Sequence, residues 1–145
     1  MKFISHNVEE TENFAYKLAS YIKAPQVICL IGNLGAGKTA FTRGFSRYFG
    51  IEKGVASPTF TILMKYSGTQ EINHYDLYRA EDYDELCDIG FEDQIDEGIS
   101  LIEWPDKFMD YLPEDKITIR IDYTQNENER EITVEGLDNY EHTCS

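Results

Sequence analysis

The sequence predicts a three-layer α/β domain, in which helices cover a mixed, partly parallel sheet. Residues 27–31 and 99–102 form continuous apolar runs, which are typical of parallel strands buried on both faces. Residues 117–121 instead alternate isoleucine with polar residues, a pattern typical of a strand with one buried face. Apolar residues at helical spacing before and after the first run predict two helices beside the sheet.

The first helix is expected to begin after Asn7, whose side chain can cap it, with Glu10 as the reciprocal capping partner. Pro25 is expected to end this element. A second helix follows the first apolar strand and is expected to end near Gly50.

The second half of the chain predicts further strands and two short helices. These are a β-hairpin, an acidic helix closed by Gly90, an apolar strand, a helix with Pro105 in its first turn, and a second hairpin. They are expected at residues 59–66 with 71–77, 81–88, 99–103, 105–109, and 117–121 with 130–135.

Residues 32–39 fit the phosphate-binding pattern G-x-x-x-x-G-K-[ST] and lie between the first apolar strand and the second helix, as that motif requires. Its glycines allow backbone N–H groups to surround a phosphate, the lysine supplies positive charge, and the threonine hydroxyl can bind Mg²⁺. The predicted fold is therefore a P-loop NTPase-like domain that binds a nucleoside triphosphate. This phosphate loop consists of Gly32, Asn33, Leu34, Gly35, Ala36, Gly37, Lys38 and Thr39.

Composition limits the possible partners. The chain has 145 residues, a net charge of −14 and a pI near 4.5. Such an acidic surface repels phosphate backbones, so we expect little or no binding to nucleic acid by the chain alone. The length favours one domain, expected over residues 1–136, with a tail at 137–145.

The cysteines and the apolar runs bear on the compartment. Cys29, Cys87 and Cys144 are widely separated and form no C-x-x-C pair, so neither a zinc site nor a disulfide framework is indicated. No secretory signal or membrane-spanning run is present. These features predict a cytoplasmic protein without membrane contact.

Two acids are candidates to hold the metal or orient water. Glu103 ends an apolar strand, where phosphate-loop proteins commonly place such an acid, although an ordinary strand-end carboxylate is the alternative. Asp76 lies in the polar and aromatic segment 74–79; its alternatives are a turn-capping role or a pair with Arg79. His74, in the same segment, is interpreted as a hydrogen-bonded structural residue.

Two further residues have open interpretations. Thr59 lies in a segment where switch proteins place a threonine that senses the γ-phosphate, but residues 57–58 could equally begin a strand. Trp104 follows Glu103 directly and is either a packing anchor or part of a nucleotide or partner surface.

Other phosphate-loop classes fit less well. A small-molecule kinase usually adds an arginine-bearing lid, but the five arginines of this chain do not cluster. A GTPase commonly carries [NT]-K-x-D for guanine and D-x-x-G after the phosphate loop, and the sequence contains neither. Hydrolysis of ATP is therefore favoured, with the kinase as the alternative.

Four segments occur in the order and spacing of one family: the phosphate loop, SPTF at 57–60, HYDLYR at 74–79 and IEWP at 102–105. On these segments the chain resembles the bacterial TsaE (YjeE-type) ATPases of tRNA threonylcarbamoyladenosine biosynthesis. The resemblance implies a small ATPase, weak by itself, that acts with TsaD and TsaB subunits. It also implies that the threonylcarbamoyl transfer takes place on another subunit, so this chain need not bind tRNA.

The resemblance also implies roles for individual residues. The phosphate loop holds the phosphates of ATP, Thr39 and Glu103 hold Mg²⁺, and Asp76 takes part in hydrolysis. Three further residues lie near the nucleotide by this resemblance: Thr11, Thr59 and Trp104.

Overall fold

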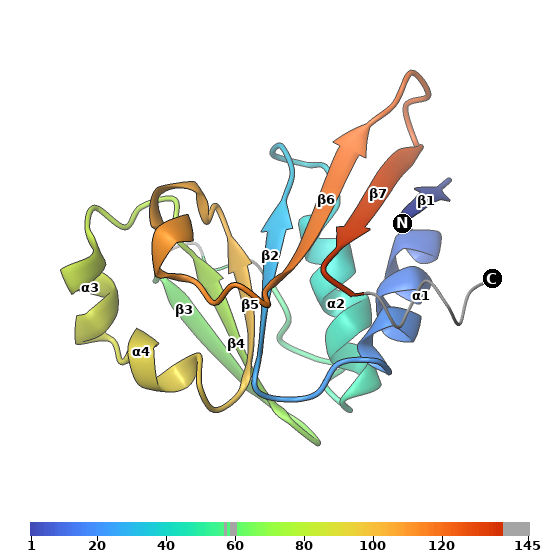
Figure 1. Ribbon diagram of the computed structural model, residues 1–145. Helices are drawn as coiled ribbons and strands as arrows, with labels where there is room; N and C mark the ends of the chain where they lie inside the picture. Colours follow the sequence, from blue (N-terminus) through green and yellow to red (C-terminus); the bar gives the residue numbers. More distant parts are fainter. Residues whose placement is uncertain (57, 59–60, 138–145) are drawn as a thin grey trace.

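A seven-stranded sheet extends through the protein, with helices on both of its faces (Figure 1). The computed structural model describes residues 1–56, 58 and 61–137. Its elements are β1 (Lys2–Ser5), α1 (Val8–Ala19), β2 (Gln26–Ile31), α2 (Lys38–Tyr48), β3 (Leu63–Ser67), β4 (Glu71–Asp76), α3 (Tyr83–Asp88), α4 (Phe91–Gln94), β5 (Ile99–Glu103), the 3₁₀ helix η1 (Asp106–Tyr111), β6 (Ile117–Tyr123) and β7 (Arg130–Glu135).

The strand order is β1-β7-β6-β2-β5-β4-β3. The four central strands, β6, β2, β5 and β4, are parallel to one another, whereas β3 at one edge and the pair β7 and β1 at the other are added in antiparallel pairings. This arrangement confirms the predicted mixed, partly parallel sheet. The carboxyl ends of the four central strands lie at one edge, which is where ligands bind in open α/β sheets.

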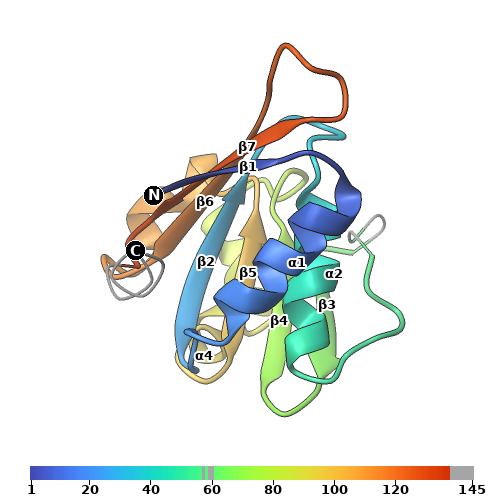
Figure 2. The same ribbon diagram turned by 90° about the vertical axis from the view of Figure 1, so that its right-hand side faces the viewer.

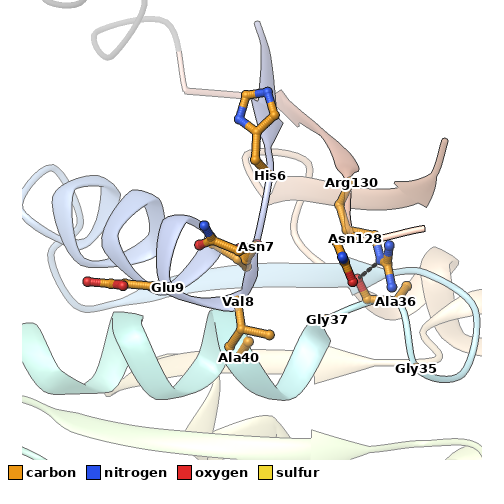
Figure 3. Close-up of a pocket in the computed structure, with 11 residues that line it drawn as sticks. His6, Asn7, Val8, Glu9, Gly35, Ala36, Gly37, Ala40, Asn128 and Arg130 are labelled. Carbon is orange, nitrogen blue, oxygen red and sulfur yellow. Dashed lines mark hydrogen bonds between the residues drawn. The ribbon is translucent and has the colours of Figure 1, made fainter. Parts of the chain in front are cut away.

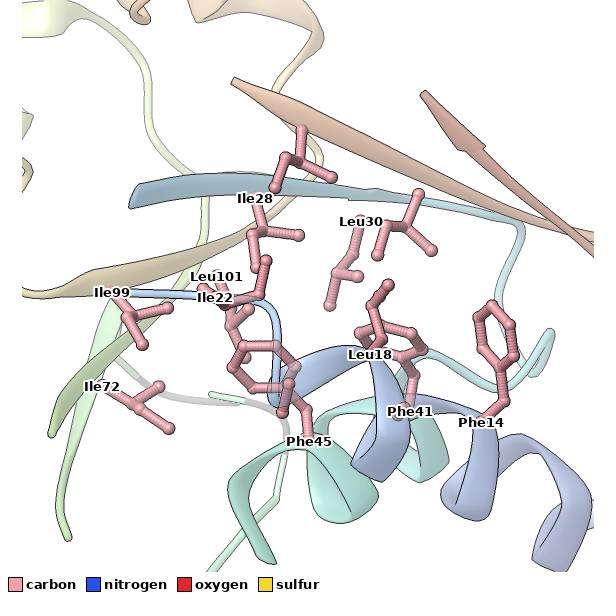
Figure 4. Packing of buried hydrophobic residues seen from close by; sticks show 14 of the residues in the cluster. Phe14, Leu18, Ile22, Ile28, Leu30, Phe41, Phe45, Ile72, Ile99 and Leu101 are labelled. Atoms are coloured by element: carbon pink, nitrogen blue, oxygen red, sulfur yellow. The ribbon is translucent and has the colours of Figure 1, made fainter. Parts of the chain in front are cut away.

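Two cores separate the layers. α1 and α2 lie side by side on one face, as Figure 2 shows. Alternation along β2 divides its side chains, because successive residues of a strand point to opposite faces. Ile28 and Leu30 pack with Phe41 and Phe45 of α2 in one core (Figure 4), while Cys29 belongs to a second core under α3, α4 and η1. The predicted three layers are therefore confirmed.

The beginning of α1 partly confirms the predicted cap. The Asn7 side chain accepts a hydrogen bond from the Glu10 N–H at 2.8 Å, as expected. The reciprocal bond is different, because the Glu10 carboxylate accepts from the His6 N–H at 2.9 Å and not from that of Asn7. The helix also ends at Ala19, before Pro25, because Ser20 and Tyr21 bond carbonyls three residues back and tighten the chain.

Four other elements differ from the prediction. β1 was not predicted, because a four-residue edge strand is specified by its distant partner β7 and not by its own pattern. The four-residue helix α4 was also not predicted, and β3 begins only at Leu63. The segment after Pro105 is a 3₁₀ helix, and Pro105 precedes it instead of lying in its first turn.

The end of the chain packs further than predicted. Leu137 is partly buried against the first core, although the tail was expected to begin at this residue. Residues 138–145, which make up the rest of that tail, lie outside the described residues. In the described part of the chain, no helix has the length and apolar character to cross a membrane.

Candidate nucleotide site

The phosphate loop joins the carboxyl end of β2 to the first turn of α2. Gly37 precedes α2 with φ 117°, a left-handed conformation that L side chains rarely adopt, and its hydrogen side chain offers no cap to the helix. A Cβ on Gly32 would lie 2.8 Å from the Ile121 carbonyl oxygen, so the loop passes too close to β6 for a side chain. The amino end of α2 therefore begins directly after the phosphate loop, as at other phosphate-binding helices.

The hairpin formed by β6 and β7 holds the outer side of the phosphate loop. The Tyr123 hydroxyl donates to the Leu34 carbonyl at 2.5 Å, and Arg130 Nε donates to the Ala36 carbonyl at 3.2 Å. The Arg130 guanidinium also lies over the Tyr123 ring, 4.6 Å from its centroid. This support could not be predicted from sequence spacing, because about ninety residues separate the partners along the chain.

Strand register brings the predicted acids together. Glu103, the last residue of β5, is aligned with Leu30 of β2 on one side and with Asp76 of β4 on the other. Both acids therefore lie at the carboxyl edge of the sheet, beside the phosphate loop. They line one pocket of about 870 Å³, together with Lys38, Thr39 and Trp104.

Lys38 lies inside this pocket between an acid and an aromatic ring. Its Nζ is 3.7 Å from Glu103 Oε1 and 4.3 Å from the centroid of the Trp104 ring. Trp104 has φ 56°, which is rare for a residue with a side chain, and its ring packs on Tyr78 at 5.2 Å between centroids. Trp104 therefore packs on Tyr78 and also lines the pocket, while its contact with a nucleotide or a partner stays a prediction.

Glu103 has a second contact that the sequence did not predict. Its Oε2 lies 2.6 Å from His74 Nε2, and both side chains are buried. His74 is a hydrogen-bonded histidine, as expected, but its partner is the candidate metal ligand. The strand register explains this contact. Asp76 is aligned with Glu103, and His74 lies two residues before Asp76 on β4, so His74 is a diagonal neighbour of Glu103 on the same face of the sheet.

Asp76 has a structural contact as well as a place in the pocket. Its Oδ1 accepts a hydrogen bond from the Tyr78 N–H at 3.0 Å, as the turn-capping interpretation requires. Among the ion pairs of the described residues, none joins Asp76 to Arg79, although Arg79 lines the same pocket. The structure therefore confirms the turn-capping contact of Asp76, and its role in hydrolysis stays a prediction.

A second pocket, of about 470 Å³, adjoins the other side of the phosphate loop (Figure 3). Thr11 lines it from α1, and its hydroxyl lies 2.7 Å from that of Ser5. Gly35 and Gly37 line both pockets, so the two spaces meet at the phosphate loop. The other polar residues that line the second pocket are His6, Asn7, Glu9, Asn128 and Arg130. The remaining site prediction, Thr59, lies outside the described residues, although its neighbour Pro58 lines the larger pocket.

The donors present suit a magnesium ion that is shared with phosphates. Among the described residues, no cluster of three or more histidine, cysteine or acidic side chains could hold a metal alone. The larger pocket offers the Thr39 hydroxyl and the Glu103 carboxylate, which are oxygen donors. Mg²⁺ typically uses one or two protein oxygens, phosphate oxygens and water, so these residues fit that ion.

Comparison with known proteins identifies the family. The model of the family described as "Threonylcarbamoyl adenosine biosynthesis protein TsaE" matches residues 5–132. The chain belongs to the TsaE family. Its resemblance to that family, first drawn from four short segments, is thereby confirmed.

Individual TsaE proteins match over nearly the whole chain. The tRNA threonylcarbamoyladenosine biosynthesis protein TsaE of Bacillus subtilis is 40% identical over 99% of this chain and 91% of its own length. The protein of the same name from Treponema pallidum is 33% identical over 92% of this chain and 99% of its own length. The crystal structure of Bacillus subtilis YdiB matches with a TM-score of 0.79 and 35% identity, over 99% of this chain and 90% of the other. This likeness supports the predicted P-loop NTPase-like fold.

Proposed function

We propose that this chain is the ATPase subunit required for threonylcarbamoyl modification of adenosine in tRNA. In this proposal it binds and hydrolyses ATP with Mg²⁺, weakly by itself, and acts with TsaD-like and TsaB-like subunits. The observation that carries the proposal is the convergence of Lys38, Thr39 and Glu103 on one pocket beside the phosphate loop. Membership of the TsaE family connects that site to tRNA modification.

The two pockets suggest how the nucleotide lies. Its phosphates would occupy the phosphate loop, where N–H groups of α2 and the Lys38 ammonium neutralise their charge. The triphosphate would extend into the larger pocket, towards Glu103 and Asp76. The nucleoside would lie in the smaller pocket beside Thr11, because the two spaces meet at Gly35 and Gly37.

Thr39 and Glu103 are the residues that would hold Mg²⁺. When bound, that ion supplies positive charge to the β- and γ-phosphate oxygens. The chain's own contributions are the fixed charge of Lys38, the enclosure by the Trp104 ring and a carboxylate oxygen of Asp76 near the site of attack. In this proposal either Asp76 or Glu103 orients the attacking water, and variants of each acid distinguish water orientation from metal binding.

ATP hydrolysis measured with and without the TsaD and TsaB subunits tests this function. We expect slow release of phosphate from the chain alone and a clear increase with both partners. Lys38→Ala should abolish turnover, whereas Lys65→Ala, which removes an exposed lysine of β3, should not. Normal hydrolysis by Lys38→Ala would refute the assignment of the phosphate loop. Transfer of phosphate to members of a nucleoside panel would instead support the small-molecule kinase.

The net charge of −14 gives a separate test. A tRNA backbone is repelled by such a surface, so we expect negligible tRNA affinity at physiological salt in the absence of partners. Filter binding or fluorescence anisotropy with labelled tRNA measures this. A submicromolar dissociation constant for the isolated chain would contradict the proposed division of labour.

A further inference from the structure

The Glu103 carboxylate is held from two sides inside the protein. Lys38 Nζ lies 3.7 Å from one oxygen, and His74 Nε2 lies 2.6 Å from the other. In the proposed function, the Lys38 ammonium neutralises the phosphates of a bound nucleotide, so its contact with Glu103 then competes with them. The contact from His74 comes from the adjacent strand β4 and not from the phosphate loop, and His74 is completely buried. An ionised carboxylate only accepts hydrogen bonds, so His74 Nε2 is the donor.

The other ring nitrogen of His74 faces a buried tyrosine. His74 Nδ1 lies 3.4 Å from the hydroxyl of Tyr66, which is on the adjacent strand β3. The same hydroxyl donates to the Ala56 carbonyl at 2.9 Å and accepts from the Ala56 N–H at 3.3 Å. A chain of contacts therefore connects Glu103, across two strands, to the backbone at Ala56. Pro58, two residues further along the chain, lines the larger pocket.

We propose that His74 is a positioning residue that orients Glu103 for Mg²⁺, and that Tyr66 ties this orientation to the segment at Ala56. This inference rests on the proposed function, because it takes Glu103 as a metal ligand. Mg²⁺ demands a nearly ideal octahedral arrangement, so a carboxylate that rotates freely binds it poorly. Hydrogen bonds to metal ligands commonly contribute 10- to 100-fold to metal affinity.

The hydroxyl proton of Tyr66 also connects the segment at Ala56 to Glu103, because it can be donated to either of two acceptors. The hydroxyl donates to Ala56 in this structure, and a second acceptor, His74 Nδ1, lies within reach. A shift of Ala56 away from Tyr66 would leave the proton to His74. The position of the segment would then alter how firmly His74 is held, and through it the orientation of Glu103.

Two substitutions of His74 separate its contacts. In His74→Gln, the longer amide can place a donor near the position of Nε2 and keep the bond to Glu103. In His74→Asn, the amide ends near the position of Nδ1, so the polar contact to Tyr66 is kept and the bond to Glu103 is lost. Tyr66→Phe removes only the hydroxyl. Tyr75→Phe is a matched control, because its buried hydroxyl donates to Gln94 on the other face of β4.

The experiment measures ATP affinity as a function of Mg²⁺ concentration, followed by the fluorescence of Trp104, which is the only tryptophan and lines the pocket. We expect His74→Asn to need about 10- to 100-fold more Mg²⁺ to reach half of the Mg²⁺-dependent increase in ATP affinity. Its ATP affinity in EDTA should change less than about two-fold. His74→Gln should recover most of this loss. Tyr66→Phe should show a smaller shift in the same direction, and Tyr75→Phe none.

Several outcomes would overturn the inference. One is a wild-type Mg²⁺ requirement in a folded His74→Asn variant, with folding checked by thermal denaturation. Another is an equal loss of ATP affinity in EDTA and with Mg²⁺, which would indicate a general structural role. If His74→Asn does not fold, Tyr66→Phe decides, and an unchanged Mg²⁺ requirement there refutes the connection. A wild-type protein without Mg²⁺-dependent ATP binding would refute the proposed function itself, before any variant is compared.

Discussion

Lys38 Nζ and Glu103 Oε1 lie 3.7 Å apart in the interior, and both side chains are less than 8% exposed. A buried charge is costly unless it is paired, so each of these groups stabilises the other in the protein without a nucleotide. If bound phosphates attract Lys38 away from Glu103, the buried carboxylate is left without a positively charged partner. The Glu103 carboxylate would then lie unpaired beside the phosphates, which is where Mg²⁺ is expected.

This pairing predicts opposite effects of Glu103→Gln on binding and on hydrolysis. Hydrolysis should fall on the order of 100-fold, because a charged group at the metal is lost. ATP affinity in EDTA should hold or rise a few-fold, because Lys38 no longer leaves an ionised partner. Phosphate release and Trp104 fluorescence measure the two effects, with the exposed acid Glu52→Gln as the control. Wild-type hydrolysis in Glu103→Gln would exclude Glu103 from the chemistry.

Asp76→Asn separates the turn-capping role of Asp76 from a chemical one. Asparagine keeps the oxygen that accepts from the Tyr78 N–H, so the thermal midpoint should change little. Hydrolysis should nevertheless fall by about 100-fold if the charge acts on water. Asp82→Asn is a matched control, because Asp82 caps α3 in a similar way through the Glu85 N–H. Full activity of Asp76→Asn would leave Asp76 with the turn alone.

Tyr123→Phe tests the support of the phosphate loop by the β6–β7 hairpin. Loss of the hydrogen bond to the Leu34 carbonyl should make the ordered conformation of the phosphate loop about 1 kcal/mol less stable, which is equivalent to roughly five-fold weaker ATP binding. Titration of ATP against Trp104 fluorescence measures this change. Tyr111→Phe, a half-exposed tyrosine stacked on Tyr83, serves as the control. Equal affinities of the two variants would show that the hairpin does not order the loop.

Gly44→Ala tests the packing of α2 on α1. A Cβ at Gly44 would lie only 2.1 Å from the Glu12 carbonyl oxygen, so the helices would have to separate. We expect the free energy of unfolding to fall by at least about 2 kcal/mol in urea denaturation. Ser46→Ala, two residues along the same helix, removes a buried hydroxyl that has no hydrogen-bond partner among the described residues. Its effect should be within about 0.5 kcal/mol. Similar stabilities of the two variants would contradict this close approach.

Cys29 predicts a loss of stability at high pH. Burial raises the pKa of its thiol to about 11 from an ordinary value of 9.0. Between these values the unfolded chain loses the proton and the folded chain keeps it, so stability falls as pH rises through this window. From pH 8 to 10.5 this should remove about 2 kcal/mol. Urea denaturation of Cys29→Ala should show a flatter pH dependence than the wild-type protein. Parallel curves would show that Cys29 ionises equally in both states.

The fold and the phosphate loop could be predicted from local patterns, whereas several site contacts could not. Residues 32–39 and Glu103 follow or end apolar strands of parallel type, so their presence at one edge followed from the predicted parallel sheet. Asp76 ends a strand that was predicted only as half of a hairpin, and its alignment with Glu103 comes from the parallel pairing of β4 with β5. The small strand β1 and the helix α4 escaped prediction, because each is too short for periodicity to distinguish it from a turn.

The sequence by itself determined the phosphate loop, the buried strands and the family, because glycine conformation and hydrophobic periodicity are local properties of the chain. Only the tertiary structure decided which groups surround Glu103 and what supports the loop. His74 and Lys38 meet Glu103 because β4, β5 and the phosphate loop become neighbours in the folded sheet. Tyr123 reaches Leu34 for the same reason, since strand order and register create contacts between residues that no sequence spacing relates.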